Sequence, residues 1–149
     1  MILSAQSIRR LGIFDPFHER TKAHGMTFGL GPAGYDVRIA ENVDLEPGAY
    51  QLASTLEHFS IPSNVLGKVA DKSTWARRGL AVQNTIIEPG WRGHLTLELS
   101  NHGTTWLRLF PGMPIAQIIL HWLDEPTEQP YQGRYQDQAS GAVAAIFET

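Results

Sequence analysis

Turn signals recur at short intervals along this chain, and they limit its fold more than any other feature. Between them lie short segments rich in apolar and β-branched residues, such as 49–55, 94–100 and 114–123. This spacing is typical of a sandwich or barrel built from many short strands, so we predict a mainly all-β fold. The turn signals are Gly31-Pro32, Pro47-Gly48, Pro62-Ser63-Asn64, Pro89-Gly90, Asn101-His102-Gly103 and Pro111-Gly112.

Helical patterns are confined to two short stretches, "AQSIRRLG" near the start and a few residues after Ser73. The 149 residues contain neither internal repeats nor low-complexity linkers, so we expect one domain spanning 1–149. The last part, from Asp124 to Thr149, is polar and then rich in Gly and Ala. It fits a mobile closing segment and a frayed end equally well.

The composition removes several kinds of site. The chain has no cysteine, which excludes disulfides, thiolate nucleophiles and cysteine-based zinc sites. Its six histidines show no metal-ligand spacing, so we predict no structural metal and treat them as ordinary surface or boundary residues. They are His18, His24, His58, His94, His102 and His121.

Charge and hydropathy limit the partners. The formal net charge is −3 and the basic residues are dispersed, so we expect no nucleic-acid polymer as a partner. No apolar run approaches the roughly 18 residues of a membrane span, and we expect no membrane association. The start, "MILSAQSIRRLG", lacks the apolar core and cleavage site of a signal peptide, so we expect a cytoplasmic protein.

The stretch "EPGWRGHLTLELSNHG", residues 88–103, carries a carboxylate inside an ordinary strand pattern. Leu95, Leu97 and Leu99 alternate with polar residues, which is the period of a half-buried strand. Glu98 belongs to the outer set. Taken alone, this position is best explained by a solvated side chain with no further role.

The stretch "ADKSTWARRGLAVQNT" predicts a short, fixed loop. Ser73 is a natural N-cap, Thr74–Arg78 can form one helical turn, and Gly79 supplies the stop. Ser73 and Arg77 are four residues apart and share a face, while Lys72 and the free N–H groups of the turn would favour an anion such as phosphate. The alternative is that Ser73 only caps the turn and that the arginines are solvated.

Several of these segments together resemble the dCTP deaminase branch of the dUTPase-like superfamily. The similarity runs nearly end to end in the same order. Its most specific parts are the Lys-Ser-x-x-x-Arg loop, the Pro-Gly-Trp-x-Gly turn with the Glu-bearing strand behind it, and the Tyr…Arg-Tyr…Gln tail. The segments are "MILSAQSI", "GYDVRIA", "LEPGAYQLASTLEHFSIPSNVLGKVADKSTWARRGL", "EPGWRGHLTLELSNHG", "LFPGMPIAQIIL" and "PYQGRYQDQASG".

The resemblance implies a homotrimer of distorted jelly-roll or β-barrel subunits with short helical segments. It also implies Mg²⁺ bound with a deoxynucleoside triphosphate, and deamination of cytosine without zinc. The absence of cysteine agrees with that last point, because zinc nucleobase deaminases hold their metal with cysteines. A side chain must then activate the water, and a carboxylate with a pKa raised towards neutral can do so.

The resemblance assigns the catalytic positions to Glu98, Ser73 and Arg77. Glu98 would move the protons, Ser73 would hold the water or the carboxylate, and Arg77 would supply positive charge near the developing negative charge. The loop of Ser73 and the strand of Glu98 would meet across chains. The implied nucleotide-binding positions are Lys72, Ser73, Thr74, Arg77, Glu88, Trp91, Tyr131, Arg134, Tyr135 and Gln138.

Three further features of the sequence bear on this prediction. Asp36 matches a family aspartate with a structural role, for which Arg38 or a backbone turn is the expected partner. The stretch between Gly79 and Pro89 is two residues shorter than the usual deaminase loop, which affects how the base would be recognised. Glu88 replaces the usual Asp.

Three functions follow from the resemblance. The first is a dCTP deaminase that gives dUTP and ammonia. The second is a dUTPase, or a bifunctional enzyme that takes dCTP to dUMP with Glu88 as the hydrolytic base. The third is a catalytically silent nucleotide-binding trimer, against which the presence of Ser73, Arg77 and Glu98 argues.

Overall fold

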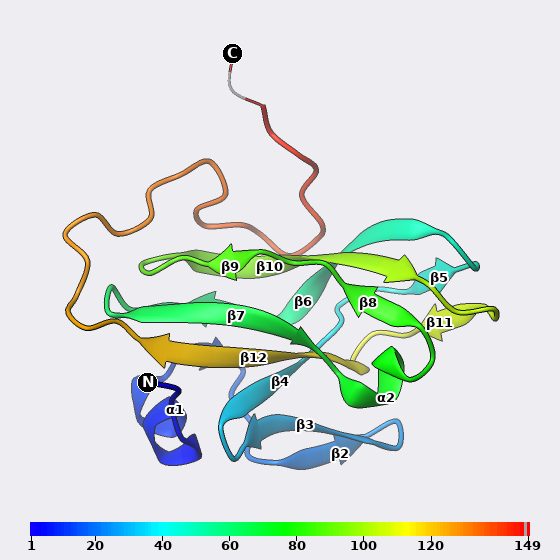
Figure 1. Ribbon diagram of the computed structural model, residues 1–149, viewed down its shortest axis with the longest axis horizontal. Coiled ribbons are helices and arrows are strands. Elements are labelled where there is room, and N and C mark those ends of the chain that lie inside the picture. Colours follow the sequence, from blue (N-terminus) through cyan, green and yellow to red (C-terminus); the bar gives the residue numbers. More distant parts are fainter. Residues whose placement is uncertain (148) are drawn as a thin grey trace.

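The computed structural model describes residues 1–147 and 149, and most of its regular secondary structure is β-strand (Figure 1). The prediction of a mainly all-β chain is confirmed. Two larger antiparallel sheets enclose the core, and a small pair of strands extends from one end. The four-stranded sheet has the order β1 (Phe14–Asp15), β6 (Tyr50–Ser60), β10 (Arg92–Asn101) and β8 (Leu80–Val82).

The second large sheet is longer and curled. Its order is β2 (Thr21–Ala23), β3 (Met26–Gly31), β4 (Gly34–Arg38), β12 (Pro114–Trp122), β7 (Val65–Asp71) and β9 (Ile86–Ile87). The remaining pair is β5 (Val43–Leu45) with β11 (Leu107–Leu109).

The core forms because both sheets turn alternate side chains inward. Leu97 and Leu99 of β10 are fully buried, and so are Ile118 and Leu120 of β12 on the other sheet. All four belong to one apolar cluster. Burial of such side chains contributes roughly 1.5–3 kcal/mol each, so this shared layer is the main stabilising feature of the fold.

An irregularity in the pairing of β10 with β6 modifies the predicted alternation. The register with β6 shifts between His94↔His58 and Thr96↔Ser54, so residues 55–57 of β6 lie opposite the single residue Leu95 and the bulge is in β6. The N–H of Leu95 donates to the hydroxyl of Thr55, 2.9 Å away, instead of to a strand carbonyl. Leu95 is therefore only half-buried and faces outward like its neighbour Thr96, contrary to the sequence pattern.

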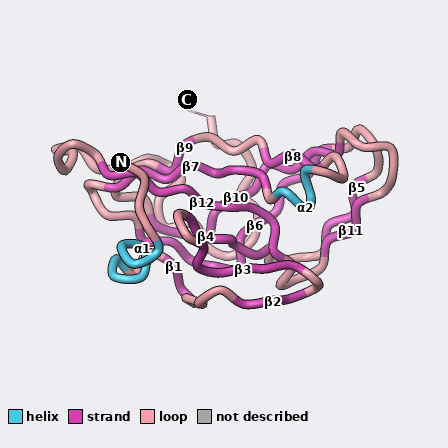
Figure 2. The backbone as a smooth tube through the Cα atoms, turned by 60° about the horizontal axis from the view of Figure 1, so that its bottom comes forward, coloured by secondary structure: helices cyan, strands magenta, loops and turns pink. Residues whose placement is uncertain are grey.

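Two short helices lie at opposite ends of the sheets (Figure 2). The first, α1 (Ala5–Leu11), ends at Gly12, whose φ of 61° is the left-handed conformation that glycine favours; this helix was predicted. The second, α2 (Ser73–Ala76), differs from its prediction at the start. Ser73 is its first helical residue, and Lys72 occupies the cap position without a side-chain cap.

Gly79 ends the turn after α2, as predicted. Its φ is +92°, and a Cβ at this position would lie 2.3 Å from the backbone nitrogen of Gly103. Only glycine fits both requirements. Because His102 also donates its N–H to the carbonyl of Gly79, α2 is held against the end of β10.

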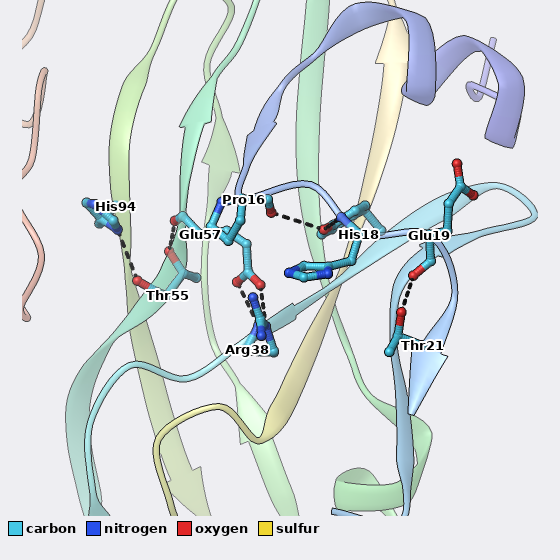
Figure 3. Close-up of polar contacts among 9 residues, drawn as sticks. Pro16, His18, Glu19, Thr21, Arg38, Thr55, Glu57 and His94 are labelled. Atoms are coloured by element: carbon cyan, nitrogen blue, oxygen red, sulfur yellow. Dashed lines mark hydrogen bonds and ion pairs between the residues drawn. The ribbon is translucent and has the colours of Figure 1, made fainter. Parts of the chain in front are cut away.

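Two ion pairs stabilise the interior. Glu57 has no exposed side-chain surface, and its carboxylate accepts from the Nε of Arg38 at 2.7 Å and from the backbone N–H of Arg38 at 2.8 Å (Figure 3). Asp36 pairs instead with Lys72, 2.7 Å from its Nζ. The expected pairing of Asp36 with Arg38 is therefore wrong, because Glu57 lies opposite Arg38 and occupies it.

Candidate functional site

A cavity of about 500 Å³ lies between the outer face of β10, the 84–88 loop and the C-terminal tail. It has the size of a small-molecule site. Six residues singled out from the sequence line it: Glu88, Trp91, Glu98, Tyr131, Tyr135 and Gln138. The rest of its wall is formed by Tyr50, Leu52, Asn84, Thr85, Ile86, Ile87, Leu95, Thr96, Val143 and Ala145.

Glu98 belongs to the wall of this cavity and is half-buried. Its neighbours Leu97 and Leu99 face the core, so the strand period turns Glu98 and Thr96 towards the cavity. Among the residues that the structure describes, the carboxylate of Glu98 has no hydrogen-bond or ion-pair partner. It is therefore available to a ligand or a water molecule.

Trp91 joins the core to the tail. It is 5% exposed and its ring lies edge-on to Phe59, with centroids 5.9 Å apart. The indole N–H donates to the carbonyl of Tyr135, 2.7 Å away. One face of the cavity is thus a fixed aromatic surface that also anchors the tail.

The tail crosses the outer side of β9 and β10, drawn in orange to red in Figure 1. Gln138 forms a parallel bridge with Gly93, and its carbonyl accepts from the N–H of His94 at 3.0 Å. Further along, Val143 donates its N–H to the hydroxyl of Thr96 at 3.1 Å. Of the two alternatives for this segment, the structure supports closure over the cavity rather than a frayed end.

The tail also forms hydrogen bonds within itself and with the turn before β10, through Tyr131, Arg134 and Tyr135. Tyr131 donates its N–H to the carbonyl of Pro89 at 2.8 Å, and the hydroxyl of Tyr135 accepts from the N–H of Ile146 at 2.9 Å. Arg134 donates to the carbonyl of Ile146 and is not among the residues that line the cavity.

The four residues of the α2 region that were predicted to act with Glu98 lie elsewhere. None of Lys72, Ser73, Thr74 and Arg77 lines the cavity, and α2 sits at the far end of β8 (Figure 1). Ser73, Thr74 and Arg77 are exposed, and the Nε of Arg77 donates to the hydroxyl of Ser73 at 3.3 Å. The ammonium of Lys72 is 9% exposed and already bound to Asp36. Within one chain, therefore, the two groups stay separate.

Comparison with known proteins identifies the family. A family model described as dCTP deaminase-like matches residues 35–123. The dCTP deaminase of Azotobacter vinelandii is 34% identical over 92% of this chain and 95% of its own length. That of Thermococcus sibiricus is also 34% identical, over 91% of this chain and 92% of its own length. The chain belongs to the dCTP deaminase-like family.

Solved structures show how this family member is built. The EIAV dUTPase superposes with a TM-score of 0.60 at 21% identity and covers 82% of this chain and 97% of its own. A Staphylococcus bacteriophage 80alpha dUTPase gives a TM-score of 0.59 at 20% identity, over 80% of this chain and 92% of its own. At this identity the likeness concerns the fold, and it confirms the predicted dUTPase-like architecture.

Neither a metal-binding group nor a membrane-spanning helix is present among the described residues. Within residues 1–147 and 149, no three His, Cys, Asp or Glu side chains gather as a metal-binding group. No helix in this part of the chain is long and apolar enough to cross a membrane.

Four polar residues of the cavity were not singled out from the sequence: Tyr50, Asn84, Thr85 and Thr96. Thr96 contacts the tail twice, through Gln138 at 3.2 Å and through Val143. The strand period of β10 places Thr96 on the same face as Glu98, so it could have been found from that pattern. Asn84 lies in the shortened loop, which gave no periodic signal.

Proposed function

We propose that this family member is a hydrolytic dCTP deaminase that converts dCTP and water to dUTP and ammonia. The observation that carries the proposal is the partner-free carboxylate of Glu98 on the wall of a cavity of about 500 Å³. The curated relatives over nearly the whole chain are dCTP deaminases, which supports the same activity. We expect the enzyme to be cytoplasmic.

The chemistry needs a group that moves protons at C4 of cytosine. Glu98 would take a proton from water, whose oxygen then bonds to C4. One proton of the water would pass to the ring nitrogen N3 and the other, from the hydroxyl added at C4, to the exocyclic amine. The bond between C4 and that amine would then break, the C4 carbonyl would form and ammonia would leave. The apolar and aromatic wall of the cavity, including Trp91 and Leu95, would hold the base and exclude other water.

Ser73 and Arg77 would reach this cavity from a neighbouring subunit. Both are exposed and lie outside the cavity of their own chain, so a homotrimer with sites at subunit boundaries would bring them to Glu98. Ser73 would orient the water and Arg77 would stabilise the negative charge that develops. Thr74 would bind phosphate beside them, and Lys72 could do so only by sharing its ammonium with Asp36.

The tail would close over the nucleotide. Tyr131, Tyr135 and Gln138 already line the cavity, and Arg134 lies in the same segment, where it would add positive charge near the phosphates. Mg²⁺ would be held mainly by the triphosphate oxygens, since the described residues offer no ligand cluster of their own, and it would neutralise phosphate charge. One solved relative, a phage phi11 dUTPase, is described with a structural Mg(II) ion.

A second activity is supported by Glu88. This carboxylate lines the same cavity as Glu98, so a dUTP formed there would lie near a second potential base. The enzyme would then also release pyrophosphate and yield dUMP. This alternative predicts that dUTP itself is a substrate.

The products distinguish these functions. Purified protein with Mg²⁺ should release ammonia from dCTP, and pyrophosphate from dUTP only if the second activity exists. Deoxycytidine and dCMP should be very poor substrates, because phosphate contacts supply the binding energy that orients the base. Absence of ammonia release from dCTP would contradict the main proposal, and equal turnover of deoxycytidine would contradict the role of the phosphates.

A further inference from the structure

Strands β8 and β10 separate next to Glu98, and the side chain of Asn84 takes the place of β8 there. The two strands pair from Asn101↔Leu80 to Leu99↔Val82, and the N–H of Gln83 still donates to the carbonyl of Glu98 at 2.8 Å. An antiparallel ladder would next offer the carbonyl of Gln83 to the N–H of Glu98. Here the chain after Gln83 turns away from β10 instead.

The amide of Asn84 replaces the missing strand. Its Oδ1 accepts from the N–H of Glu98 at 3.1 Å, and its Nδ2 donates to the carbonyl of Thr96 at 2.7 Å. A carboxamide carries one acceptor and two donors in a plane, like a peptide group, so it satisfies both backbone groups at once. The main chain after Asn84 is then free to diverge, and residues 84–88 all line the cavity.

This arrangement links the shape of the cavity to the position of one carboxylate. Thr96 and Glu98 flank Leu97 on the same strand edge, and the carbonyl of Thr96 and the N–H of Glu98 are both bonded to the side chain of Asn84. Without it, a half-buried N–H and carbonyl would lack partners and the strand next to Glu98 could shift. Aliphatic side chains of similar size cannot make either bond.

We infer that Asn84 is a positioning residue for Glu98, which it holds in place for the reaction while keeping the cavity open. The inference rests on the proposed function, because it assumes that Glu98 moves the protons. Asn84 acts through the backbone of Glu98 and needs no contact with the reacting atoms. The other ionisable groups that line this cavity are Glu88 of the same loop, Tyr50 of β6, and Tyr131 and Tyr135 of the tail.

The first test separates kcat from KM. In the full-length protein with dCTP and Mg²⁺, Asn84→Ala should lower kcat for ammonia release by about 10²-fold, the usual effect of a misplacement near 1 Å, while KM changes less than about threefold. Gln83→Ala is the matched control: its side chain is exposed and outside the cavity, and its backbone bond to Glu98 survives, so its kcat should stay at the wild-type value.

Asn84→Asp tests the positioning role with a side chain of nearly the same shape. It keeps an acceptor for Glu98, loses the donor to Thr96 and adds a negative charge near the Glu98 carboxylate. A like charge disfavours ionisation, so the acid limb of the kcat–pH profile should move to higher pH. A residue with only a structural role would lower the melting temperature and leave this limb in place.

The outcomes separate the two proposals. If the wild-type protein releases no ammonia, the proposed function fails. If the wild-type protein is active and Glu98→Gln is inactive, but Asn84→Ala keeps kcat within threefold, the role of Asn84 is overturned alone. If Asn84→Ala does not fold, Asn84→Asp decides: an unchanged kcat and pH profile would also overturn the inference.

Discussion

At the scale of single residues, Glu98 decides whether the cavity is an active site. Glu98→Gln keeps the shape of the side chain but cannot move protons, so ammonia release from dCTP should fall by about 10²- to 10⁴-fold. Binding of dCTP, measured by calorimetry, should survive. Glu88→Gln is the parallel variant: loss of pyrophosphate release from dUTP with ammonia release intact would show two separate activities. Near-normal deamination by Glu98→Gln would contradict the mechanism.

The buried pair of Arg38 and Glu57 belongs to the same scale but concerns stability. Glu57→Ala leaves the charge of Arg38, which is 13% exposed, without its partner. Removal of one partner from a buried pair costs about 3–5 kcal/mol, and urea denaturation should show a loss of that order. Glu19→Ala removes the partner of Arg9 in an exposed pair and should unfold at nearly the wild-type urea concentration. Equal effects of the two variants would contradict this reasoning.

At the scale of elements, we expect the tail to open and close over the nucleotide. It is held to β10 by hydrogen bonds of backbone and side-chain groups and by an exposed ion pair, in which Arg92 contacts both oxygens of Asp137 at 2.9 and 3.1 Å. The guanidinium of Arg92 donates to the carboxylate of Asp137 and thereby lowers the pKa of Asp137. A tail held this way can stay closed and still open for nucleotide exchange.

This pair predicts how tail closure depends on pH. Because the pKa of Asp137 is lower in the folded state, the pair stabilises closure above the unfolded value near 3.9, and this contribution is lost as pH falls through the folded value. Hydrogen exchange of the amides of Val143 and Ile146, relative to core amides of β10, should be constant from about pH 7 to 5 and rise only in stronger acid. In Asp137→Asn, whose residue also tolerates the φ of 58°, exchange should be faster and this acid step should vanish. An identical acid step in the variant would assign it to another group.

At the scale of the whole molecule, the separation of α2 from the cavity predicts assembly. One chain has a mass of 16.6 kDa, and sedimentation at micromolar concentration should give three times this value. Refolding a mixture of Arg77→Ala and Glu98→Gln subunits, each inactive alone, should restore activity, because about a quarter of the boundary sites then combine two intact residues. Monomers in sedimentation, or no activity in the mixture, would contradict a site shared between chains.

The sequence alone determined the local features of this protein. Turn chemistry and a period of two predicted the strands, Gly12 and Gly79 marked the ends of the helical turns, and the outer set of β10 contained Glu98. These features depend on neighbours within a few residues, so local stereochemistry is enough to predict them. The resemblance of ordered motifs predicted the family and six of the residues that line the cavity.

The tertiary structure decided the features that join distant segments. The pairing of Lys72 with Asp36, the bulge of β6 opposite Leu95 and the contacts of the tail depend on which strands become neighbours, which no local pattern encodes. The same applies to Asn84, whose amide can bond to the backbone of β10 only because β8 and β10 separate beside it. Local rules apply along the chain, whereas a buried ion pair or a backbone group without a strand partner is satisfied by whatever side chain the fold brings within about 3 Å.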